Sequence, residues 1–205
     1  MPQPRATVVV FDIGKVLVDW DPRHLYRTMF ADEAAMERFL AEVCTRDWIL
    51  SLDRGKPFAQ AIPERIAEFP HYEKEIRAFD ERWHESNRGV IKGSITILEK
   101  LQAAGVPNYA ITNFSGEKFE EARDIFPFFD SFDGIVVSGH ENLLKPEAAI
   151  YRLLLDRHGL RAGDCIFIDD SLANVDGACA VGMHGHHFTS PDGLARELRA
   201  HGFEV

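Results

Sequence analysis

From Ile91 to the end of the chain, short apolar runs alternate with longer segments in which apolar residues recur at helical spacing. This alternation is typical of a parallel sheet with helices packed on its faces. The apolar runs predict strands at Thr7 to Phe11, Asn108 to Ile111, Gly134 to Val137, Cys165 to Ile168 and His184 to Phe188. The intervening segments predict helices at Ser94 to Ala104, Gly116 to Ile125, Glu147 to His158, Leu172 to Ala180 and Pro191 to Ala200.

The stretch from Asp21 to Asn87 interrupts this rhythm. It holds successive helical segments with no convincing strand, at Pro22 to Phe30, Glu33 to Cys44, Pro57 to Glu68 and Tyr72 to Ser86. Asp21 followed by Pro22 is a strong helix start signal. We therefore predict a helical insertion over residues 21–87 in an α/β core made of residues 1–20 and 88–205. Serine N-caps are predicted at Ser94, Ser171 and Ser190.

Composition indicates a chain that folds on its own core. Of the 205 residues, 45% are apolar and 27% are charged, and this length can bury a sizeable core without covalent staples. Three cysteines, Cys44, Cys165 and Cys179, are scattered without a CxxC pair, which favours neither a disulfide framework nor a zinc site. The start of the chain has no long apolar run. We expect a cytoplasmic protein that neither enters a membrane nor is secreted.

The net charge of the chain restricts the kinds of molecule that it can bind. A net charge of -10 opposes nucleic acid, because phosphate backbones are bound through clustered cations. An anionic substrate would have to be attracted by a local site or by a bound cation. The sequence does not determine the oligomeric state.

Polar side chains cluster where the predicted strands end. In an open parallel sheet, ligands bind at the carboxyl ends of the strands, so residues just past each strand share one edge. Each of them alone could be a helix cap, a turn residue or a solvated residue. Together they place several reactive groups on that edge, namely Asp12, Thr112, Asn113, Asp169 and Asp170, with Lys145 at the start of a helix.

These residues resemble the motifs of the haloacid dehalogenase superfamily, in the subgroup with a helical C1 cap after the first motif. FDxGxVL surrounds Asp12, Thr112 forms the second motif, KPxxxIY begins at Lys145, and DDSxxN contains Asp169 and Asp170. The set in this order is far more specific than any one motif. The resemblance implies a hydrolase with an α/β fold, a Rossmann-like doubly wound parallel sheet with a helical cap inserted after the first strand.

The resemblance further implies that Asp12 is a nucleophile that forms a covalent aspartyl intermediate, which water then hydrolyses. A carboxylate can act in this way at neutral pH without a base to activate it, and covalent catalysis splits one difficult step into two easier ones. In the family pattern, Thr112 and Asn113 donate hydrogen bonds to the transferring group. Lys145 neutralises charge on the nucleophile and on the phosphoryl oxygens.

A bound cation is expected at the same edge. Three carboxylates in one crevice would repel one another, and oxygen ligands beside a phosphate point to Mg2+. By similarity to the family, Asp12, Asp169 and the backbone carbonyl of Gly14 are the direct metal ligands. Asp170 then binds through a water or holds the lysine.

Gly14 departs from the usual phosphatase pattern, which has an Asp there to protonate the leaving oxygen. General acid catalysis contributes about a hundred- to ten-thousandfold, so its loss slows the enzyme or restricts it to better leaving groups unless another residue replaces it. A group resembling α-glucose-1-phosphate phosphatases also has Asp-x-Gly, followed by an acid that matches Asp19. Asp19 is therefore a candidate surrogate acid, and the alternative is a solvated turn residue.

The polar segment SLDRGKPF interrupts the helical insertion. Arg54 stands there beside Gly55, and a cation on a flexible turn could reach over a substrate. The alternative is an ordinary solvated loop.

Three functions remain open at this point. The first is a Mg2+-dependent phosphomonoester hydrolase for a small phosphorylated metabolite, such as a sugar phosphate, acting through an aspartyl-phosphate intermediate. The second is a metal-independent 2-haloacid dehalogenase, which adjacent Asp169 and Asp170 disfavour because no metal would offset their charge, although Gly14 slightly favours it. The third is a degenerate, non-catalytic protein that binds a phosphorylated ligand, supported only by Gly14.

Overall fold

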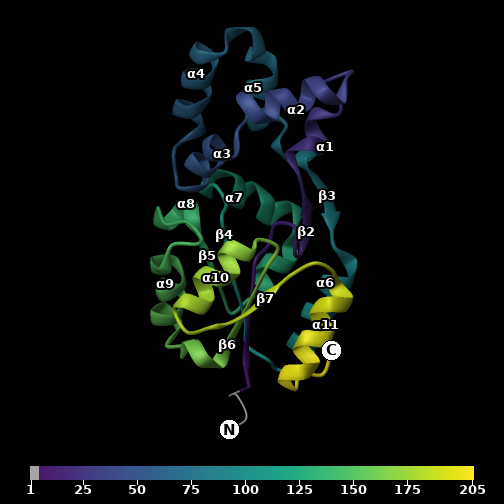
Figure 1. Ribbon diagram of the computed structural model, residues 1–205, viewed down its shortest axis with the longest axis vertical. Coiled ribbons are helices and arrows are strands. Elements are labelled where there is room, and N and C mark those ends of the chain that lie inside the picture. Colours follow the sequence, from purple (N-terminus) through teal and green to yellow (C-terminus); the bar gives the residue numbers. More distant parts are fainter. Residues whose placement is uncertain (1–4) are drawn as a thin grey trace.

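The computed structural model of the protein describes residues 5–205, and its centre is a five-stranded parallel sheet (Figure 1). The strand order is β5-β4-β1-β6-β7. The strands are β1 (Val8–Phe11), β4 (Asn108–Thr112), β5 (Gly134–Val137), β6 (Cys165–Asp169) and β7 (His184–His187). All five predicted sheet strands are confirmed, with ends that differ by at most one residue, and so is the α/β fold class.

Helices cover both faces of the sheet. They are α6 (Lys92–Ala103), α7 (Gly116–Ile125), α8 (Ser138–Glu141), α9 (Ala148–His158), α10 (Leu172–Ala180) and α11 (Pro191–His201). Val9 of β1 packs in one apolar cluster with Leu98 of α6 and Leu194 of α11. Its neighbour Val10 packs in another cluster with Leu154 of α9. Because successive side chains of a strand point to opposite faces, the fully buried β1 has to be apolar along its whole length.

The helix start signals are confirmed in part. Asp21 and Ser190 accept hydrogen bonds from the backbone N–H groups of Arg23 and Gly193, as N-caps do. Ser171 occupies the N-cap position of α10 without a side-chain capping bond. The prediction for Ser94 is wrong, because α6 begins two residues earlier and Ser94 lies buried inside it.

Five α-helices lie between β2 (Val18–Trp20) and β3 (Asn87–Val90), which pair as an antiparallel ribbon. The sequence does not predict this ribbon. The helices are α1 (Pro22–Tyr26), α2 (Glu33–Glu42), α3 (Arg46–Asp53), α4 (Phe58–Glu68) and α5 (Glu73–Glu81). Short 3-10 helices at Pro70–Tyr72 and Trp83–Ser86 lie among them, and two more, Pro127–Ser131 and Ala162–Asp164, lie later in the chain. We call the part from α1 to Ser86 the helical region and the rest the sheet region. The helical region has its own apolar cluster, around Leu25, Phe39 and Phe79.

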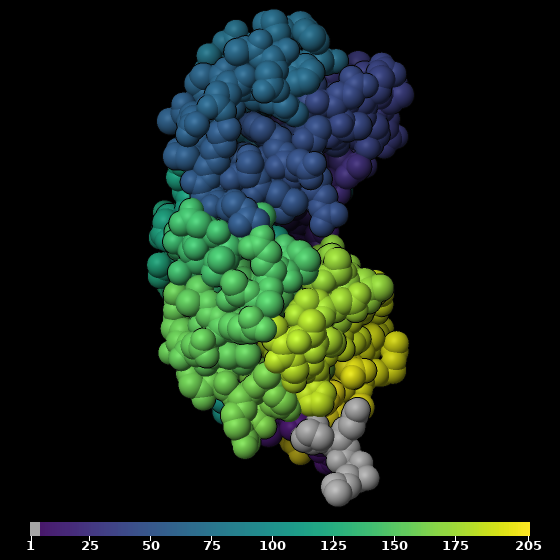
Figure 2. Space-filling model, turned by 60° about the vertical axis from the view of Figure 1, so that its left-hand side comes forward, coloured from purple at the N-terminus to yellow at the C-terminus, as the bar shows by residue number. Residues whose placement is uncertain are grey.

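The helical region lies at one end of the molecule, above the sheet (Figure 1). Figure 2 shows the two regions in contact, with the outline indented on one side where they meet. Helix α3 packs on α8 of the sheet region. The Ser138 hydroxyl donates to the carbonyl of Asp53 and accepts from the N–H of Phe114, which ties the end of α3 to the loop after β4.

Within residues 5–205, no helix is long and apolar enough to cross a membrane. Cys44, Cys165 and Cys179 are free thiols.

Candidate active site

Asp12 lies at the carboxyl end of the central strand. Its backbone N–H donates to the carbonyl of Ile168 at 2.8 Å, so the pairing of β1 with β6 continues through Asp12. The side chain therefore projects at the sheet edge between β4 and β6, where it is 7% exposed. This is the position that the resemblance implies for a nucleophile.

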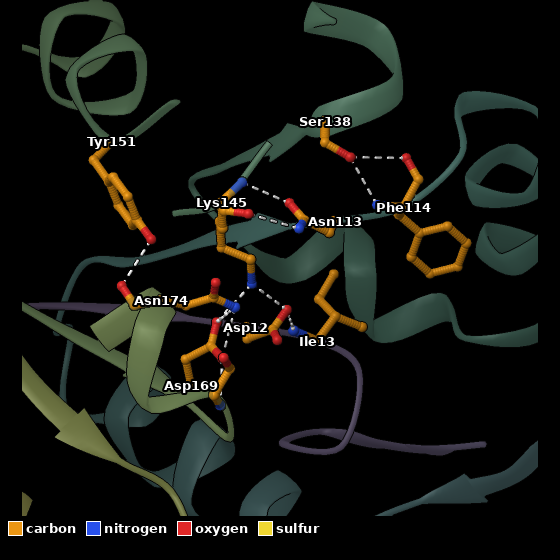
Figure 3. Close-up of polar contacts among 10 residues, drawn as sticks. Asp12, Ile13, Asn113, Phe114, Ser138, Lys145, Tyr151, Asp169 and Asn174 are labelled. Carbon is orange, nitrogen blue, oxygen red and sulfur yellow. Dashed lines mark hydrogen bonds and ion pairs between the residues drawn. The ribbon is translucent and has the colours of Figure 1, made fainter. Parts of the chain in front are cut away.

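Lys145 bridges two of the acids (Figure 3). Its Nζ lies 2.7 Å from Oδ1 of Asp12 and 2.7 Å from Oδ2 of Asp169. The residue is buried, and burial alone would lower the pKa of its ammonium, but the two carboxylates outweigh burial and the pKa is raised. Lys145 therefore remains a cation in the site.

Asp169 and Asp170 have different surroundings. Asp169 is fully buried, and its carboxylate accepts from the N–H of Ser171 at 2.8 Å and from Nδ2 of Asn174 at 3.0 and 3.1 Å, besides Lys145. Asp170 is half-buried and lines the cavity described below. The contacts thus fix Asp169 behind the site and leave Asp170 facing it.

The three acids form a compact cluster. One carboxylate oxygen each from Asp12, Asp169 and Asp170 lies within 4.8 Å of the others. Burial raises the pKa of Asp12, the ion pair with Lys145 opposes this rise, and Asp169 and Asp170 add to it. Burial and Asp169 also raise the pKa of Asp170. One ammonium group therefore does not offset the three carboxylates, and a divalent cation would.

The donor set fits a hard cation. The turn after Asp12 pairs the N–H of Lys15 with the carbonyl of Val18, and the N–H of Val18 with the carbonyl of Ile13. The carbonyl of Gly14 has no hydrogen-bond donor among residues 5–205, so it is free to bind a metal. Carboxylate and carbonyl oxygens are the ligands that Mg2+ prefers.

Thr112 and Asn113 follow the neighbouring strand. Thr112 is buried at the end of β4 and lines the cavity. The side-chain amide of Asn113 donates to the carbonyl of Lys145 at 3.1 Å and accepts from its N–H at 2.8 Å (Figure 3). Asn113 thereby fixes the backbone that carries the bridging lysine, a positioning contact that the sequence does not predict.

A cavity of about 500 Å3 opens over Asp12, between the sheet region and the helical region. The two residues expected to contact substrate, Asp19 of β2 and Arg54 at the end of α3, lie outside its lining. Arg54 pairs with Glu147 where the two regions meet, and Asp19 is half-exposed and pairs with His24 at 3.1 Å. Neither contact brings the side chain toward Asp12.

Asp53, the residue before Arg54 in the sequence, lines the cavity, and it is not predicted as a site residue. The reason is that α3 is not predicted, although Thr45 caps it and Trp48, Ile49 and Leu52 follow at helical spacing. Burial raises the pKa of Asp53 to about 7, while a backbone hydrogen bond from Ser115 and the charge of Lys145 lower it.

Comparison with known families agrees with this geometry. The sequence profile described as haloacid dehalogenase-like hydrolase matches residues 6–182. A sesquiterpene phosphatase of Aspergillus oryzae is 38% identical over 104 residues, which are 51% of this chain and 53% of that protein. A chloroplast flavin mononucleotide hydrolase of Arabidopsis thaliana is 39% identical over 61 residues, 30% of this chain and 25% of that protein. The aligned parts therefore span about half or less of these relatives.

Solved structures share the fold at low sequence identity. A haloacid dehalogenase family enzyme of Bacteroides thetaiotaomicron, in complex with magnesium and inorganic phosphate, has a TM-score of 0.69 and 19% identity, over 90% of this chain and 95% of that one. An L-2-haloacid dehalogenase has a TM-score of 0.67 and 17% identity, over 95% of this chain and 99% of that one. Both the phosphate-binding and the dehalogenating chemistry therefore occur on this fold.

Proposed function

The chain belongs to the haloacid dehalogenase-like hydrolase family, and we propose that it is a Mg2+-dependent phosphomonoester hydrolase for a small phosphorylated metabolite. The observation that carries this proposal is the buried cluster in which Lys145 bridges two carboxylates and Asp170 adds a third. A dehalogenase that works without a metal would have no charge to offset the third acid. The crowding of acids therefore favours the phosphatase.

Asp12 is the proposed nucleophile. One of its carboxylate oxygens attacks phosphorus, the bond from phosphorus to the ester oxygen breaks, and an aspartyl phosphate forms on Asp12. Water then attacks the same phosphorus, which releases inorganic phosphate and restores the carboxylate. Lys145 neutralises charge on the phosphoryl group, and Thr112 donates a hydrogen bond to it.

Mg2+ is the proposed cofactor, held by Asp12, Asp170 and the carbonyl of Gly14. When bound, it supplies the positive charge that offsets the acids and the phosphate. The family resemblance implies the opposite roles for the acid pair, with Asp169 as the ligand. The hydrogen bonds of the structure favour Asp170 as the ligand, because Asp169 already binds Lys145, Asn174 and the N–H of Ser171. The magnesium and phosphate complex of the Bacteroides thetaiotaomicron enzyme supports a metal site on this fold.

The substrate is proposed to be a phosphate ester. The sesquiterpene phosphatase that matches half of this chain supports that class. A sugar phosphate, the α-glucose-1-phosphate phosphatase subgroup and a cytoplasmic location stay predictions from the sequence.

The test is a panel of aryl, alkyl and sugar phosphates, each assayed for phosphate release with Mg2+ and with a chelator. We expect release that the chelator abolishes and that added Mg2+ restores. Halide release from a 2-haloacid, unaffected by the chelator, would identify a dehalogenase instead. Binding of phosphate without any turnover would identify a degenerate binding protein.

A further inference from the structure

We propose that the cavity beyond the acids binds an apolar alcohol group, so that the substrates are phosphomonoesters of hydrocarbon-like alcohols. This inference rests on the proposed phosphatase function and narrows its substrate class. The site then has two ends, a polar one at Asp12 for the phosphate and an apolar one toward the helical region.

Half-buried apolar side chains line the outer part of the cavity. Trp20 comes from β2, Leu40 from α2, Ile49 and Leu50 from α3, and Phe114 from the loop after β4. Each leaves part of its apolar surface open to the cavity. A hydrocarbon that covers this surface removes it from water, which favours binding. Apolar walls from both regions favour binding of a hydrocarbon over binding of a sugar.

Aromatic side chains lie behind this layer. Phe58 and Phe79 are buried in the apolar cluster of the helical region and also line the cavity, and their rings stack with 6.2 Å between the centroids. Trp83 lines it as well and packs on Phe114 at 5.3 Å between ring centroids. Both the half-buried and the fully buried side chains named here are therefore apolar.

Among the described residues, four cations line the cavity, Lys15, Arg23, Arg46 and Lys118, and two of them are already engaged. Lys118 is buried, and its Nζ lies 2.7 Å from Asp80 and 2.7 Å from Glu121. Arg23 forms hydrogen bonds of 2.6 and 2.8 Å to Glu37. Sugar hydroxyls buried in this part of the cavity would lose water without gaining these groups as partners, which is costly.

The volume suits a molecule of this kind. At about 500 Å3 the cavity is within the range of small-molecule sites, roughly 300 to 1,000 Å3. The phosphate occupies only the polar end beside the acids. The remaining space takes a hydrocarbon of several carbons.

The test is a series of straight-chain alkyl phosphates of increasing length, with a hexose phosphate for comparison. The leaving-group chemistry is constant along the alkyl series, so differences in kcat/KM report binding of the chain. We expect kcat/KM to rise about fourfold for each added methylene until the cavity is full. The hexose phosphate should be a poorer substrate than the longer alkyl esters.

Two variants test whether the dependence on chain length arises in the cavity. Ile49→Asn should flatten the rise with chain length, because it puts a polar group on the wall. Ile125→Asn alters an exposed apolar residue outside the cavity and should leave the series unchanged. Esters hydrolysed at rates independent of chain length, or a preferred hexose phosphate, would overturn the apolar site alone. Absence of hydrolysis of every ester would overturn the proposed function as well.

A different observation carries a second proposal: we infer that Asp53 protonates the departing alcohol. Gly14 has no side chain for this task, and Asp19 lies outside the cavity. Asp53 lines the cavity from the end of α3 in the helical region, and its carboxyl accepts a hydrogen bond from the backbone of Ser115, in the loop after β4, the strand beside β1. As the ester bond breaks, its proton passes to the alcohol oxygen. The carboxylate then takes a proton from the attacking water.

The surroundings of Asp53 suit an acid that is protonated near neutral pH. Its pKa is raised to about 7 by burial, and Lys145 lowers it only in part. Neighbouring charges are engaged elsewhere, since Arg54 pairs with Glu147. On α8, which packs against α3, His140 lies near Glu120 and Glu141 pairs with Arg157.

The test compares the parent and Asp53→Asn on alkyl and aryl phosphates across pH. In the parent, kcat/KM for alkyl esters should fall above pH about 7, where Asp53 loses its proton. Asp53→Asn should slow alkyl esters by about a hundredfold or more, slow aryl esters much less, and remove that alkaline fall. Equal losses for both ester classes, or an unchanged pH profile, would make Asp53 a structural residue and overturn the proposal.

Discussion

At the scale of single residues, the site depends on one lysine held between two acids. Lys145 lies 2.7 Å from both Asp12 and Asp169, and Asn113 fixes its backbone. Breaking a buried pair leaves an uncompensated charge, which is more costly than the pair is favourable. Asp12, Lys145 and Asp169 therefore depend on one another.

The acid pair provides a residue-scale prediction about metal binding. Asp169→Asn should weaken Mg2+ binding about tenfold, since it alters only a group that positions others. Asp170→Asn should weaken it clearly more, because Asp170 is the proposed ligand. Titration calorimetry with Mg2+ measures both affinities. Equal losses, or a larger loss for Asp169→Asn, would restore the roles that the family resemblance implies.

Gly14 provides a second residue-scale prediction. A Cβ added at Gly14 would meet no atom within 4 Å, so an acidic side chain can be accommodated there. In an Asp53→Asn background, Gly14→Asp should speed alkyl esters by up to about a hundredfold, because it supplies a new proton donor. The measurement is a leaving-group series of kcat/KM for both variants. An unchanged steep series would mean that the backbone does not present the new carboxyl to the leaving oxygen.

The sequence predicts the reactive residues better than the residues that support them. Asp12 and Asp170 directly follow strands, Asp169 ends one, and Lys145 lies shortly before α9, so the ends of predicted elements mark all four. The contact of Asn113 with the backbone of Lys145 joins positions that are 32 residues apart. Such a contact leaves no periodic signal in a single sequence.

At the scale of elements, α3 connects the two regions. Its last residue, Asp53, lines the cavity and accepts from Ser138 through its carbonyl. From the sequence, only the polar break SLDRGKPF is recognised, and no helix is predicted over Arg46–Asp53. Likewise β2 and β3 are short strands that pair with each other at the two ends of the helical region, and their pattern is too brief to predict a strand.

Gly55 provides the element-scale prediction. Its φ is +104°, and an added Cβ would lie 2.8 Å from Oδ1 of Asn142 and 2.9 Å from the carbonyl of Gly139. Gly55→Ala should therefore lower the free energy of unfolding by about 1–3 kcal/mol. Gly163→Ala is the matched control, since its Cβ would meet no atom within 4 Å, and it should change stability by less than about 0.5 kcal/mol. Equal unfolding midpoints in denaturant would show that the helical region yields to the extra methyl group.

At the scale of the whole molecule, the acids and the cavity have different roles. In the proposed function, residues at the strand ends of the sheet region carry out the reaction, and the cavity walls shared with the helical region select the alcohol group. The net charge of -10 would repel an anionic ester, so the proposed substrate needs local positive charge, which Lys145 and the proposed Mg2+ supply. The cavity could not be predicted, because Trp20, Ile49 and Phe114 meet only in the folded chain.

The most direct test of the account is phosphate release by Asp12→Asn. The amide is nearly the same size as the carboxyl but a poor nucleophile, and Lys145 keeps its pair with Asp169. We expect steady-state release from an aryl phosphate to fall at least about a thousandfold in the presence of Mg2+, with circular dichroism and thermal unfolding like those of the parent. Release that continues at the parent rate in the folded variant would contradict a nucleophilic Asp12.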